Sequence, residues 1–263
     1  MTTITGTGPY SPSSIYSQNT NRPVTTANAD AGSASTAGST AATGNTKSLA
    51  DVVAAAANSA GLDFATLGQN ARTVLDAGIA AYGQTPGSQT SDEQWVKIFG
   101  GMDRRSLYAV TSNQGGQFNP QEQKIAKTIM DAQLANVGDV SSSASAGQQI
   151  AGYSQKVGFL NTVSAEEKKS ASWAYSMADV QTAARMADIN SKMPQISGTS
   201  PFLSTLMGAM YNVRSQVSGP VDFGTVNNLS DITSQPWARS YAGQIEQAFA
   251  ASYQPGGSFS VSV

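Results

Sequence analysis

SDEQWVKIFGGMDRRSLYAVTSNQGGQFNPQEQKIAKTIMDAQ, residues 91–133, is the stretch that decides the fold of this chain. Ser91 and Gln94 form a predicted capping box, in which each side chain accepts a hydrogen bond from a free backbone N–H at the start of a helix. Residues 119–122, NPQE, repeat the signal with an Asn cap, a proline at the first helical position and an acid at the third. The stretch therefore predicts two short helices, a Gly-Gly loop and a longer helix.

Apolar residues at helical spacing continue on both sides of this stretch. We expect a helix over 64–82, because Gly83 stands where a C-terminal glycine belongs. The longest helix is predicted from the cap Ser164 to about Met193, just before Pro194. Further helices are expected over 48–58, 103–110, 150–160 and 201–217 and after Ser234, whereas 221–233 looks irregular. About seven or eight helices and almost no alternating runs predict an all-α fold, a helical bundle.

The N-terminal part of the chain differs from the rest, since its first 46 residues contain only two charged residues. Ser, Thr, Ala, Gly and Asn dominate there, and such a segment cannot bury enough apolar surface to offset the entropy lost on ordering. We therefore expect a disordered low-complexity segment over 1–46 and an α-helical domain over 47–254, with a candidate subdivision near 138–147. The tail 255–263 is expected to be flexible or strand-like.

Composition excludes several functions. Charged residues make up 12% of the chain and the net charge is −2. Because nucleic-acid binding needs a clustered positive surface, we expect no nucleic-acid partner. No apolar run approaches the roughly 20 residues that span a bilayer, and we find no Sec signal peptide pattern. The lack of Cys and His excludes disulfides, thiolate nucleophiles, His general bases and Cys/His zinc sites, so no cofactor is expected.

Residues 111–122, TSNQGGQFNPQE, have the spacing of a calcium-binding loop. Gly116 falls at the sixth position, where the chain must turn sharply, and Glu122 at the twelfth, the position of a bidentate carboxylate. Phe118 takes the apolar eighth position. With a helix predicted on each side, this framework resembles a degenerate EF-hand loop, and the resemblance implies a helical regulatory or binding module.

The oxygen donors of this loop depart from the EF-hand pattern. The calcium site would consist of Thr111, Asn113, Gln117 and Glu122, and Glu122 is its one carboxylate. Gly115 stands where a further ligand belongs. Because Ca²⁺ affinity follows the charge of the ligands, we expect a capped helix–loop–helix without an ion.

A second, fainter copy of the loop would end at Glu167. Val163 then takes the apolar position and Ser164 the cap. Asn161 takes the sharp turn, since Asn tolerates positive φ. This spacing raises the hypothesis of an internal duplication.

Arg104 and Arg105 are the candidates for partner binding. They follow Asp103 at a predicted helix start, where cations are unfavourably placed relative to the helix dipole. Two interpretations follow: an internal ion pair, for example with Asp131 or Asp92, or recognition of a protein partner.

Catalysis would depend on carboxylates, since helical lysozyme-like domains use a Glu as general acid. The candidates are Glu122, Glu166, Glu167 and Glu246. Helix capping or a solvated helix face explains three of them, and no nucleotide-binding glycine motif is present. We therefore expect no catalytic residue.

Low charge, a Ser/Thr/Ala/Asn/Gln-rich composition and the absence of Cys make the chain similar to bacterial proteins exported by the flagellar (type III) route, such as flagellins and their accessory proteins. This resemblance is compositional and covers mainly residues 1–90. It implies a non-catalytic, exported structural or interaction protein, flagellum-associated or at the cell surface, with protein partners or self-assembly. The alternatives are a degenerate EF-hand-like module in the cytoplasm and a Glu-dependent, helical peptidoglycan-cleaving enzyme.

Overall fold

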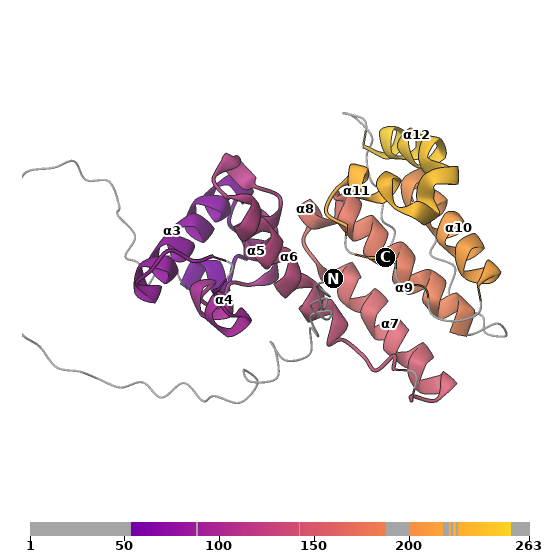
Figure 1. Cartoon of the computed structure of the whole chain (residues 1–263), viewed down its shortest axis with the longest axis horizontal. Coiled ribbons are helices and arrows are strands. Elements are labelled where there is room, and N and C mark those ends of the chain that lie inside the picture. Colours follow the sequence, from indigo (N-terminus) through magenta and orange to yellow (C-terminus); the bar gives the residue numbers. More distant parts are fainter. Residues whose placement is uncertain are drawn as a thin grey trace, which may run out of the picture. The chain divides into compact units, whose positions relative to one another are not determined.

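The computed structural model describes residues 54–87, 89–141, 143–187, 200–217, 221, 223–224 and 226–253 (Figure 1). Within these ranges the regular elements are helices and no strand occurs, which confirms the all-α prediction. The predicted segments 1–46 and 255–263 lie outside them. Residues 54–57 are helical. The elements that follow are α3 (Phe64–Tyr82), α4 (Asp92–Ile98), α5 (Arg104–Thr111), the 3₁₀ turn η1 (Gln114–Gly116), α6 (Pro120–Ala135), α7 (Ala146–Thr162), α8 (Ala165–Lys168), α9 (Ala171–Ala187), α10 (Pro201–Gln216), α11 (Leu229–Ser234), η2 (Pro236–Tyr241) and α12 (Ala242–Ser252).

The chain divides into two compact units, Met1–Asn119 and Pro120–Val263. The division falls at the start of α6. The stretch 138–147, which the sequence marks as a candidate subdivision, lies inside the second unit, after α6, and its last two residues begin α7. In the described ranges, no helix combines the length and the apolar character that crossing a bilayer requires.

Helix α3 is the centre of the first unit, where α4, α5 and η1 pack against it. Its N-cap Asp63 accepts a hydrogen bond from the Thr66 backbone N–H at 2.8 Å, and Gly83 ends it in the left-handed conformation. At Gly78 the backbones of α3 and α4 nearly touch, since a Cβ atom there would lie 2.1 Å from the Ile98 carbonyl oxygen. The apolar core of this unit includes Leu67, Ala71, Val74 and Leu75 of α3, Trp95 and Ile98 of α4, and Leu107 and Val110 of α5.

Two of the caps predicted within residues 91–133, at Ser91 and Asp103, form as expected. The capping box closes, with the Ser91 N–H donating to Gln94 Oε1 at 2.8 Å and the Gln94 N–H donating to Ser91 Oγ at 3.3 Å. Asp103 caps α5 by accepting from the Ser106 N–H at 2.8 Å. Pro120 is the first residue of α6.

Helix α9 is the centre of the second unit. It packs against α7 on one side and α10 on the other, and α12 packs against α10 (Figure 1). The core includes the fully buried Met177, Phe202, Leu206, Met210 and Ile245. Trp173 lies partly buried against this core, and its indole N–H donates to the Leu160 carbonyl at 2.9 Å.

The predicted long helix from Ser164 is wrong in its continuity. It is broken between α8 and α9, where the Ser170 hydroxyl accepts from the Trp173 N–H at 3.1 Å and so starts a new helix. The Tyr253 hydroxyl donates to the Ser170 carbonyl at 3.2 Å, which ties the break to the end of α12. The predicted helix end at Met193 lies outside the described residues.

The stretch 221–233 is not irregular throughout, because α11 begins at Leu229. Asn228 and Asp231 form a capping box that starts it, a signal of the same kind as Ser91 and Gln94. The final helical stretch is also divided, into η2 and α12.

Candidate functional site

The loop after α5 has left-handed backbone at Gly116, where the sequence predicts a sharp turn, and also at Asn113 and Gly115. Asn113, Gly115 and Gly116 have φ values of 53°, 75° and 70°. The Asn113 side chain stabilises this turn, since its Oδ1 accepts from the Phe118 N–H at 2.9 Å. Thr111, the first candidate calcium ligand, is the last residue of α5.

The polar groups of this loop contact the protein itself. Arg72 of α3 donates to the Gln117 carbonyl at 3.3 Å, and its guanidinium carbon lies 5.6 Å from the centre of the Phe118 ring. In an EF-hand the carbonyl at the seventh position, here that of Gln117, binds the calcium ion. Arg72 therefore places a positive charge where a calcium loop would hold its ion. Glu122, at the third position of α6, is 3% exposed and has an interaction partner. Among the described residues, no group of three or more acidic side chains is placed to hold a metal ion.

The proposed second copy of the loop is wrong. Asn161, predicted at a sharp turn, is a residue of α7, and the one non-glycine residue with positive φ in the described ranges is Asn113. Ser164 does cap α8, accepting from the Glu167 N–H at 3.2 Å. The sequence pattern that ends at Glu167 therefore marks the start of α8 and no calcium-type loop.

Asp103 and Arg105 anchor the segment that precedes α3. The Arg105 guanidinium donates to the carbonyls of Ser59 and Leu62 at 2.9 and 2.8 Å. Asp103 accepts from the Ser59 N–H at 2.8 Å while also capping α5. Arg104 is half-buried and has an interaction of its own. The start of α5 is thus a clamp on residues 59–62, built from charge-assisted hydrogen bonds.

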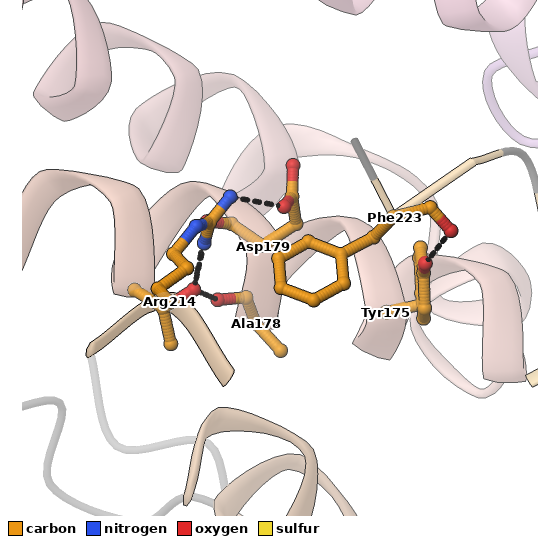
Figure 2. Close-up of polar contacts among 6 residues, drawn as sticks. Tyr175, Ala178, Asp179, Arg214 and Phe223 are labelled. Carbon is orange, nitrogen blue, oxygen red and sulfur yellow. Dashed lines mark hydrogen bonds and ion pairs between the residues drawn. The ribbon is translucent and has the colours of Figure 1, made fainter. Parts of the chain in front are cut away.

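A second polar cluster joins α9 to α10 (Figure 2). The Arg214 guanidinium donates to the Asp179 carboxylate at 2.6 Å, to the Asp179 carbonyl at 2.8 Å and to the Thr182 hydroxyl. It also lies over the Phe223 ring, with 4.7 Å from the guanidinium carbon to the ring centre. Tyr175 donates to the Phe223 carbonyl, as Figure 2 shows. The cluster holds Phe223 against both helices.

Lys156 of α7 is a buried cation, 6% exposed. Its ammonium donates to the carbonyls of Leu134 and Ala135 at 2.7 and 2.9 Å, which satisfies acceptors at the C-terminal end of α6. Burial lowers the pKa of Lys156, and the charge of Asp179 opposes that shift. Burial raises the pKa of Tyr153, which lies one turn before Lys156 on α7.

The four candidate catalytic glutamates occupy helix positions. Glu122 and Glu167 are buried in the first turns of α6 and α8, and both have interaction partners. Glu166 precedes Glu167 in α8 and also has a partner. Glu246 is exposed on α12. None of these four is a buried carboxylate left without a partner, the feature that would favour general acid chemistry.

Sequence reasoning missed the roles of Lys156, Asp179 and Arg214. A weak signal was present for Lys156, because it shares a helix face with the buried Gly152 and Leu160, four residues away on either side. Asp179 and Arg214 lie 35 residues apart in the chain, and their pairing has no local signal.

No family model, curated protein or solved structure matches this chain.

Proposed function

We propose that this protein is a non-catalytic, exported α-helical protein that acts through structural or protein–protein interactions. The observation that carries the proposal is how three of its partly or fully buried cations are used. Arg105, Lys156 and Arg214 each donate to backbone carbonyls of the protein itself. Side chains committed in this way hold segments together, and they are poorly placed to exchange protons with a substrate.

The surface supports a role in protein contacts. The exposed residues of α7 are small or polar and carry no charge, and so are those of α10. The cores of protein interfaces are depleted of charged residues, since burying an unpaired charge is costly. The exposed, uncharged residues of the two helices are Ala146, Gly147, Gln148, Ala151, Ser154, Gln155, Gly158, Asn161 and Thr162 on α7, and Pro201, Ser204, Gly208, Asn212, Ser215 and Gln216 on α10.

Export is supported by composition. The chain has no Cys, few charges and a Ser/Thr-rich N-terminal part, as do proteins exported by the flagellar route. The proposed location is the cell surface or the medium, with a flagellum-associated role as its specific form.

Cell fractionation tests the proposal. The protein would be followed by immunoblot in washed cells and in culture medium, in its bacterial host and in a derivative that lacks the flagellar export apparatus. We expect it in the medium of the parent and inside the cells of the derivative, with a cytoplasmic marker retained in both. Retention in the cytoplasm of both strains would contradict export and favour an intracellular module.

A further inference from the structure

We draw no further inference here: the strongest candidate, the uncharged outer face of α7 formed by Gly147, Ala151, Ser154 and Gly158, has the small side chains that allow close helix contact, but nothing in the described part of the chain shows what covers it.

Discussion

At the scale of single residues, two basic side chains of this protein donate hydrogen bonds to backbone carbonyls of other segments. Arg105 binds two carbonyls of the segment before α3, and Lys156 binds two at the end of α6. A backbone carbonyl that is shielded from water and left without a donor costs about 1–3 kcal/mol. The Ser59 and Leu134 carbonyls also accept from the backbone N–H groups of Leu62 and Val137, so each cation removes such a cost at its other carbonyl. These side chains therefore act as connectors between segments.

The clamp at Arg105 gives the first prediction. Arg105→Met removes both donors while keeping much of the aliphatic stem, and we expect a loss of about 2–3 kcal/mol in the free energy of unfolding. The measurement is a urea titration. Lys97→Met is the control, because Lys97 is an exposed cation in the last turn of α4 and its removal should cost less than about 1 kcal/mol. Equal losses in the two variants would contradict the clamp.

Lys156 gives a prediction of pH dependence. Its pKa in the folded protein lies below the ordinary 10.5 because of burial. Between the folded value and 10.5 the unfolded chain binds more protons, so the contribution of this residue to stability rises with pH in that window. It is complete above 10.5 and is lost as the pH falls through the folded value.

The test compares the wild type with Lys156→Met in denaturant titrations at several alkaline pH values. The unfolding free energy of the wild type, minus that of the variant, should increase as the pH rises toward 10.5. Tyr153, whose pKa is raised, is present in both proteins and largely cancels from the difference. A difference that falls over this window would contradict the assigned burial of the ammonium.

At the scale of elements, the approach of α3 to α4 depends on the absence of a side chain at Gly78. Gly78→Ala would place a Cβ atom 2.1 Å from the Ile98 carbonyl oxygen, so one backbone must move. Overpacking of this kind costs about 1–3 kcal/mol, occasionally more, and we expect a lower thermal midpoint. Gly158→Ala in α7 is the matched control, since its Cβ meets nothing within 4 Å. Ala exceeds Gly in helix propensity by about 0.8–1.0 kcal/mol, so this variant should be unchanged or more stable.

The loop between α5 and α6 gives a prediction about calcium. Asn113 Oδ1 is engaged by the Phe118 N–H and the Gln117 carbonyl by Arg72, so an ion would have to displace both contacts. We expect the thermal midpoint to be the same in millimolar Ca²⁺ and in chelator, because stabilisation needs a dissociation constant below the ion concentration. A rise of several degrees with Ca²⁺ that Glu122→Gln abolishes would instead establish a working EF-hand.

At the scale of the whole molecule, we expect the described helices to supply the stability of the chain. Residues 1–46 contain no Leu, Phe or Trp. Their deletion removes little apolar surface that folding could bury, so we expect the thermal midpoint to stay within a few degrees of the full chain. Differential scanning calorimetry of the two chains is the measurement. A large drop would mean that this segment packs on a unit, and the predicted boundary at residue 46 would be wrong.

The sequence by itself determined the all-α class and many of the helix starts, because these depend on local chemistry. Ser91 with Gln94, and Asp103, lie within a few residues of the backbone groups that they satisfy. Gly83 ends α3 for an equally local reason, since the left-handed conformation there favours a residue without Cβ. Signals of this range can be read from one stretch of chain.

Tertiary structure alone decided what Arg105 and Arg214 contact. Arg105 reaches carbonyls more than 40 residues away, and Arg214 meets Asp179 from another helix. The break at Ser170 is likewise tied to Tyr253, 83 residues further on. Such pairings depend on which helix faces meet, and that is set by the packing of the whole core. For these two arginines the sequence therefore fixes the sign of the charge, while the partner is set only when distant segments come together.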